Sequence, residues 1–93
     1  MDEIRDDVKN GRYEAIVDGH LAELGYRLEG DRLLVVYTGV PGPIEGRGVA
    51  GRLMEAVVAR AKHDGLTVVP LCSYARYWLD EHRQELGDLP VAG

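Results

Sequence analysis

The sequence is organised around residues 40–61, VPGPIEGRGVAGRLMEAVVARA, in which a turn rich in glycine and proline runs into an amphipathic helix. Gly46, Gly48 and Gly51 carry no side chain that could cover the backbone N–H groups of this turn. From about Arg47 onward, apolar residues recur every three or four positions, which predicts a helix with one buried face. Bare amides at a helix N-terminus attract anions, because the N–H groups point outward and the helix dipole adds partial positive charge. The stretch therefore predicts a site for a phosphate or pyrophosphate.

Three β-strands are predicted before this turn, over residues 13–17, 20–28 and 32–38. The first two flank Asp18-Gly19, a dipeptide typical of a tight hairpin turn, and the third follows the turn residues 29–31. We expect these strands to form an antiparallel meander. Pro41 and Pro43 end it, because proline has no N–H group to donate to a neighbouring strand.

One strand and a second helix are predicted after the central helix. His63-Asp64-Gly65 closes that helix, and the apolar run LTVVPL, residues 66–71, follows as a short strand. Since a helical crossover leads to it, we expect it to lie parallel to the strand at residues 32–38. Ser73 is expected to cap a second helix over residues 74–86, whereas residues 1–11 and 87–93 are expected to be loosely ordered. The fold class is therefore α/β, with an α+β mixed sheet in a single domain of residues 1–93.

Composition narrows the class of protein. With 45% hydrophobic and 29% charged residues, the 93-residue chain resembles a soluble globular domain, and a net charge of −5 disfavours nucleic-acid binding. It contains no apolar run long enough to span a membrane, and its acidic N-terminus does not resemble a signal peptide. A single cysteine, Cys72, excludes an intrachain disulfide, and no metal-ligand spacing is recognisable. We expect a cytoplasmic monomer or weak homodimer without a metal ion.

Two motifs resemble the GNAT superfamily of N-acetyltransferases, and in particular its very small YjdJ-like branch. They are IEGRGVAGRL, residues 44–53, and VVPLCSYARYWLDEH, residues 68–82. The resemblance implies a reduced GNAT fold: a three-stranded meander, a CoA-binding loop and helix, a parallel strand and a second helix. It implies acetyl-CoA as the cofactor, with its pyrophosphate on the amides of residues 46–51 and its thioester carbonyl near the backbone of Val40. The implied activity is acetyl transfer to a primary amine of a small molecule, peptide or protein.

The resemblance and the chemistry of individual side chains together give the candidate site residues. Those implied to bind the cofactor are Val40, Gly46, Arg47, Gly48, Val49, Ala50, Gly51, Cys72, Ser73 and Trp78. The candidate catalytic residues are Cys72, which lies near the expected thioester sulfur, and Tyr77, a phenol that could donate a proton to the CoA thiolate. Cys72 also has a simpler interpretation as a small buried residue. Glu23, on the exposed face of the predicted sheet, could act as a base for the amine, although strand carboxylates are usually solvated.

Several residues depart from the pattern of the superfamily. Glu45 stands where Gln or Arg is usual, and Leu79 stands where the superfamily usually has a general-acid tyrosine. The small branch commonly reads His-Thr-Glu-Val where this chain has residues 37–40, YTGV. These departures motivate an alternative hypothesis, in which the domain is a non-catalytic CoA-binding or protein-interaction module.

Overall fold

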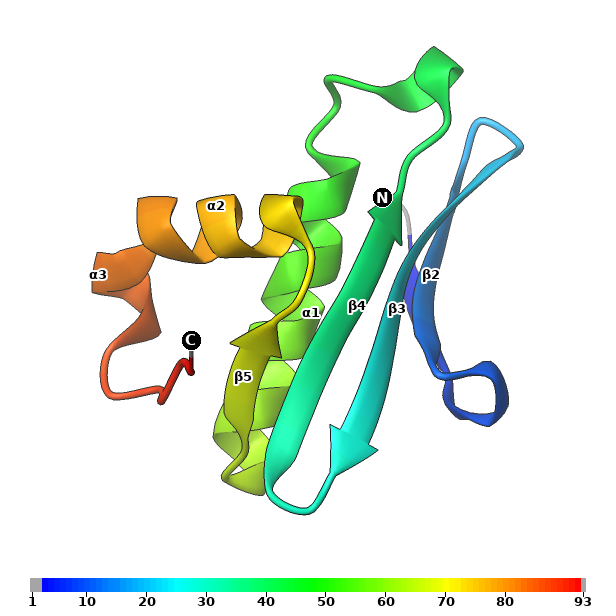
Figure 1. The fold of residues 1–93 in the computed structure, drawn as a ribbon. Coiled ribbons are helices and arrows are strands. Elements are labelled where there is room, and N and C mark those ends of the chain that lie inside the picture. Colours follow the sequence, from blue (N-terminus) through cyan, green and yellow to red (C-terminus); the bar gives the residue numbers. More distant parts are fainter. Residues whose placement is uncertain (1–2, 93) are drawn as a thin grey trace.

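A five-stranded mixed sheet forms the body of the computed structural model, which describes residues 3–92 (Figure 1). The strands lie in the order β1-β2-β3-β4-β5, in which the first four are antiparallel neighbours and β5 is parallel to β4. The strands are β1 (Ile4–Asp7), β2 (Arg12–Val17), β3 (His20–Glu29), β4 (Arg32–Gly39) and β5 (Thr67–Pro70). The helices are α1 (Val49–Asp64), α2 (Ser73–Glu81) and α3 (Arg83–Leu86). The predicted meander, crossover helix and parallel strand are confirmed.

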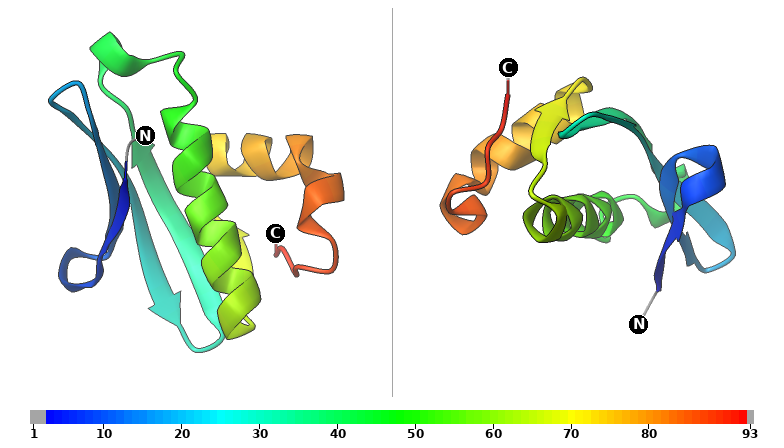
Figure 2. Two further views of the ribbon diagram at one scale, coloured as in Figure 1. Left: turned by 180° about the vertical axis from the view of Figure 1, so that it is seen from behind. Right: turned by 90° about the horizontal axis from the view of Figure 1, so that it is seen from below.

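The core lies between one face of the sheet and α1. Side chains of a strand alternate between its two faces, so every second residue of β2, β3 and β4 points toward the helix. On α1, the side chains of Leu53, Met54 and Val57 are fully buried at the three- and four-residue spacing that the sequence shows. Seen along the helix axis, α1 covers one face of the sheet, whereas no helix of the described residues covers the opposite face (Figure 2).

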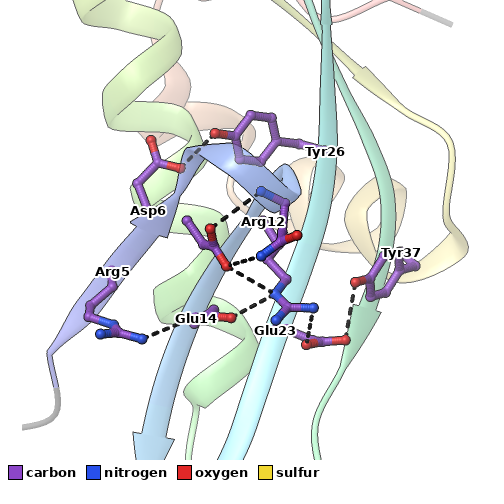
Figure 3. Close-up of polar contacts among 9 residues, drawn as sticks. Arg5, Asp6, Arg12, Glu14, Glu23, Tyr26 and Tyr37 are labelled. Carbon is purple, nitrogen blue, oxygen red and sulfur yellow. Dashed lines mark hydrogen bonds and ion pairs between the residues drawn. The ribbon is translucent and has the colours of Figure 1, made fainter.

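The N-terminal segment corrects the expectation that residues 1–11 are loose. Within the described part of that segment, β1 pairs with β2 and is followed by a short 3₁₀ turn, Val8–Asn10. One of the acidic residues that suggested disorder, Asp6, has two partners: Tyr26 Oη donates a hydrogen bond of 2.6 Å to its carboxylate, and Arg60 Nη1 of α1 lies 3.0 Å from the same group (Figure 3 shows the Tyr26 contact). Arg5 on β1 likewise lies 3.1 Å from Glu14 on β2. Residues 1 and 2 lie outside the described part of the chain.

The C-terminal segment, also expected to be loose, is bonded to the edge of the sheet over its described residues. The N–H group of Val68 on β5 donates to the carbonyl of Pro90 at 3.0 Å, and the N–H group of Ala92 donates to the carbonyl of Val68 at 2.9 Å. Val91 thereby forms a parallel bridge with β5. These apolar residues find a partner that the short sequence pattern did not reveal, and residue 93 lies outside the described part.

The helix boundaries differ from those expected in two places. α1 begins at Val49 and not at Arg47, because Gly48, with a φ of 74°, adopts a left-handed conformation that interrupts the helix. The second predicted helix is divided at His82 into α2 and α3, and its N-cap residue is Cys72 and not Ser73. The Cys72 Sγ atom accepts a hydrogen bond of 3.4 Å from the N–H group of Ala75. A thiol therefore occupies the capping position in which a hydroxyl was expected.

Candidate functional site

The strands β4 and β5 pair along only part of their length, and the candidate site begins where the pairing stops. The last paired residues are Val35 and Pro70, after which the N–H group of Leu71 donates to the carbonyl of Val35 at 2.9 Å. Here the register of β4 against β3 shifts: Tyr26 pairs with Val35 and Gly25 pairs with Tyr37, so Val36 is an additional residue on β4. Such a bulge bends its strand. The end of β4 is therefore hydrogen-bonded to β3 but has no β-pairing to β5 (Figure 1).

A surface pocket of about 410 Å³ connects this end of β4 with the N-terminus of α1. Strand β4 and the residue after it contribute Thr38 and Val40, and α2 contributes Tyr74. The remaining lining residues come from the turn and from the first turn of α1: Ile44, Glu45, Gly46, Gly48, Val49, Ala50 and Gly51. Six of the ten residues that the sequence indicated for cofactor binding line this one pocket.

The glycines of the turn leave backbone amides accessible at the start of α1. Gly46 and Gly48 have φ angles of 79° and 74°, and open space lies where a Cβ atom would stand on either residue. No side chain caps the N-terminus of α1 among the described residues, and its first turn contains no acidic residue. An uncapped helix N-terminus presents N–H groups to a ligand and favours negative charge there. The chemistry of this part of the pocket therefore fits a phosphate or pyrophosphate.

Two charged residues of the turn, Glu45 and Arg47, affect the charge at this expected phosphate site. Arg47 does not line the pocket, and its guanidinium group forms an ion pair with Asp18 at the β2–β3 turn. The sequence-based expectation that Arg47 contacts the cofactor would require this ion pair to open. Glu45, which departs from the superfamily pattern, is exposed and lies among the lining residues.

The residues at or near α2 that the sequence indicated for the site do not line the pocket. Tyr77 has 62% of its surface exposed and does not line the pocket. Trp78 is buried, stacks on His82 with a centroid distance of 3.9 Å, and has its Nε1 atom 3.2 Å from the point where a Cβ atom on Gly51 would lie. Trp78 thus packs α2 against α1. Cys72 and Ser73 lie at the N-terminus of α2, outside the pocket lining.

Tyr74 is the aromatic residue that the sequence analysis did not select for the site. Its hydroxyl lies 3.9 Å from the point where a Cβ atom on Gly51 would stand, at the first turn of α1. Burial raises the pKa of Tyr74 above its usual value, and the neighbouring Tyr77 raises it further. The sequence contained one indication of this placement: Tyr74 lies four residues before the buried Trp78, and residues four apart share a face of a helix.

Comparison with known proteins identifies the class of protein that this fold and pocket represent. Residues 12–89 match the sequence profile of the GCN5-related N-acetyltransferases. The chain belongs to this family, whose members typically transfer an acetyl group from acetyl-CoA.

The chain is also similar to a solved structure, a GCN5-like protein of Staphylococcus aureus determined by NMR in solution and proposed to be an N-acetyltransferase. The two share 28% sequence identity with a TM-score of 0.76, over 98% of this chain and 88% of that one. A search among curated proteins found no match.

Two further features of the described residues bear on the class of site. No group of three or more His, Cys, Asp or Glu side chains in residues 3–92 is arranged to hold a metal ion. Within the same residues, none of the helices is both long enough and apolar enough to cross a membrane.

Proposed function

We propose that the protein is an acetyl-CoA-dependent N-acetyltransferase that acts on a primary amine. The observation that carries the proposal is the pocket that joins the end of β4, where its pairing with β5 has stopped, to the uncapped N-terminus of α1. Backbone N–H and C=O groups at the end of β4 can hydrogen-bond to the amide groups of an extended ligand, and the uncapped N–H groups of α1 can bind its pyrophosphate. Membership of the family supports the same assignment. Bound acetyl-CoA would supply an activated thioester as the acetyl donor.

In this proposal the residues of the pocket have separate tasks. The amides of residues 46–51 bind phosphate, and the backbone of Val40 orients the acetyl group at the end of β4. Tyr74 holds a proton on its Oη atom at the pocket, since its raised pKa keeps the phenol protonated at neutral pH. We prefer Tyr74 to Tyr77 as the proton donor, because a general acid must lie within reach of the reacting group. Cys72 acts through its cap on α2.

Isothermal titration calorimetry with acetyl-CoA tests the binding half of this proposal. We expect saturable binding by the wild-type protein, with a dissociation constant of roughly 1 mM or lower. Ala50→Glu should weaken it at least about tenfold, equivalent to about 1.4 kcal/mol, because a carboxylate would occupy the phosphate position. A glutamate in the first helical turn suits the helix dipole, so the variant should fold. The control is Ala59→Glu on the exposed side of the same helix, which should bind normally.

Thiol release in the presence of a panel of primary amines tests the chemical half. Turnover above the rate of acetyl-CoA hydrolysis is expected for the wild-type protein, and Tyr74→Phe should lower kcat about 10²-fold or more while acetyl-CoA still binds. Tyr77→Phe is the matched control on the same helix. Binding without turnover on any amine would instead support the alternative of a non-catalytic CoA-binding module, and the absence of binding would refute both.

A further inference from the structure

A carboxylate and a phenol converge on the face of the sheet that no described helix covers. Tyr37 Oη on β4 donates a hydrogen bond of 3.1 Å to Glu23 Oε1 on β3 (Figure 3). Arg12 Nη1 on β2 lies 3.6 Å from the other oxygen, Oε2, of Glu23. The Glu23 side chain is 27% exposed, so two neighbours hold the carboxylate in place while solvent still reaches it.

The charges around Glu23 do not balance. Arg12 also lies 2.6 Å from Glu14 and 3.7 Å from Asp7, and Arg5 lies 3.1 Å from Glu14. Two guanidinium groups thus face three carboxylates (Figure 3 shows those of Arg5, Arg12, Glu14 and Glu23). Glu14 is almost fully buried and takes its partners at the shortest distances. The unbalanced negative charge is therefore shared by Asp7 and Glu23, whose side chains are 25% and 27% exposed, and at Glu23 it favours a cation.

Gly39 leaves open the surface beside Glu23. The two residues are direct partners in the β3–β4 ladder, and a Cβ atom on Gly39 would meet only the Cγ atom of Glu23, at 3.9 Å. The neighbours of Gly39, Thr38 and Val40, line the cofactor pocket. Since side chains alternate along a strand, the open surface at Gly39 lies directly behind that pocket. A small group bound there would be separated from the pocket by the backbone of β4 alone.

Two apolar side chains are exposed where β4 and β5 separate, three residues before Gly39 on β4. Val36 is 37% exposed and Leu71 is 54% exposed. The hydrogen bond from the Leu71 N–H group to the Val35 carbonyl, 2.9 Å long, brings Leu71 beside Val36 at the point where β4 and β5 separate. A ligand that binds Glu23 and also contacts Val36 and Leu71 would bind more tightly with an apolar stem, because burying apolar area is favourable.

We propose that Glu23, Tyr37 and Gly39 form the acceptor site of the transferase, and that the acceptor is a primary amine carried on an apolar stem. This inference rests on the proposed function. Glu23 binds the acceptor in its ammonium form, Tyr37 positions the Glu23 carboxylate, and Gly39 provides the room through which the amine approaches the end of β4. The ammonium group gives up its proton to the solvent that reaches Glu23, the free amine attacks the thioester carbonyl, and the carbon–sulfur bond breaks as the CoA sulfur takes the proton held by Tyr74. An acceptor with a carboxylate of its own is disfavoured by the charge of Glu23.

Steady-state kinetics with phenethylamine and with 4-aminobutyrate test the inference at saturating acetyl-CoA. We expect phenethylamine to be the better substrate, and Glu23→Gln to raise its KM at least tenfold while the acetyl-CoA affinity measured by calorimetry stays within twofold. Glu29→Gln is the matched control, because Glu29 lies on the same strand and its exposed carboxylate forms an ion pair with the exposed Arg27. It should leave both values unchanged.

Gly39→Val provides a second variant that does not remove charge. The valine side chain fills the opening, and its Cβ atom would make an ordinary van der Waals contact of 3.9 Å with Glu23 Cγ. The variant should therefore fold and bind acetyl-CoA but acetylate phenethylamine poorly. An unchanged KM in Glu23→Gln, together with normal activity in Gly39→Val, would overturn the inference and leave the transferase function intact. A wild-type protein that binds acetyl-CoA but acetylates neither amine would overturn the inference as well.

Discussion

Replacing Gly25 with alanine would place a Cβ atom inside the space that the Tyr37 ring occupies. The new atom would stand 2.1 Å from Cε2, 2.5 Å from Cδ2 and 2.8 Å from Cζ of that ring. These separations are far shorter than a van der Waals contact, so the ring must move. Tyr37 is 40% exposed and can swing outward, but it then loses its 3.1 Å hydrogen bond to Glu23.

The loss in free energy of unfolding caused by Gly25→Ala has two contributions. Loss of one solvent-accessible hydrogen bond to a carboxylate costs about 1 kcal/mol, and residual crowding in a packed site adds up to about 1 kcal/mol. We expect Gly25→Ala to lower the free energy of unfolding by about 1–2 kcal/mol in urea titrations followed by circular dichroism. For a domain of this size, each 1 kcal/mol corresponds to a fall in Tm of roughly 4–8 °C.

A double-mutant cycle with Tyr37→Ala distinguishes the ring from other causes. If the ring is responsible, adding Gly25→Ala to the Tyr37→Ala protein should change the free energy of unfolding by less than about 0.5 kcal/mol. Gly39→Ala on the adjacent strand is the control, because its Cβ atom would meet an ordinary contact of 3.9 Å. An equal cost of Gly25→Ala with and without the ring would refute the reasoning and assign the cost to the bulged backbone.

Two further predictions concern α2 and the attachment of β1. Cys72→Ala should remove the N-cap of α2 and lower the free energy of unfolding by about 1 kcal/mol, whereas Cys72→Ser should restore stability in urea titrations; equal stability of the two variants would contradict a capping role. Burial and the hydrogen bond to Asp6 raise the pKa of Tyr26 above its usual 10.0, so the folded state holds this proton more tightly than the unfolded chain does. The resulting stability is present below pH 10.0 and is lost as the pH rises through the folded pKa. Tyr26→Phe should therefore flatten the alkaline loss of stability between about pH 9 and pH 11, and an equally steep loss in the variant would argue against it.

The strands of the meander could be predicted because their signals are local. Asp18-Gly19 specifies a hairpin turn by itself, and the apolar alternation on either side fixes which face is buried. Strand β1 could not be predicted in this way. Its acidic residue Asp6 is stabilised by Tyr26 and Arg60, which lie far away in the sequence. A sequence pattern records the charge of Asp6 but not its partners.

The candidate site likewise contains residues that local sequence predicts and residues that depend on distant contacts. The glycines of the turn indicate accessible amides whatever the position of the rest of the chain, and in the structure they line the pocket. The choice between Tyr74 and Tyr77 depends on the direction in which α2 leaves β5. The Cys72 cap and the packing of Trp78 against Gly51 set that direction, and neither contact could be inferred from spacing alone.

The partial pairing of β4 with β5 has a consequence for the order in which the chain folds. The hairpins of the meander join residues close in sequence, whereas Arg32 meets Thr67 only after the whole turn and α1 have been enclosed. Closing a long loop costs entropy before its contacts are made, so we expect the meander to form early and β5 to dock late. Strand β5 carries α2, and with it Tyr74. The phosphate-binding turn and the phenol would then be brought together in the last step of folding, and the pocket would be among the first features lost on partial unfolding.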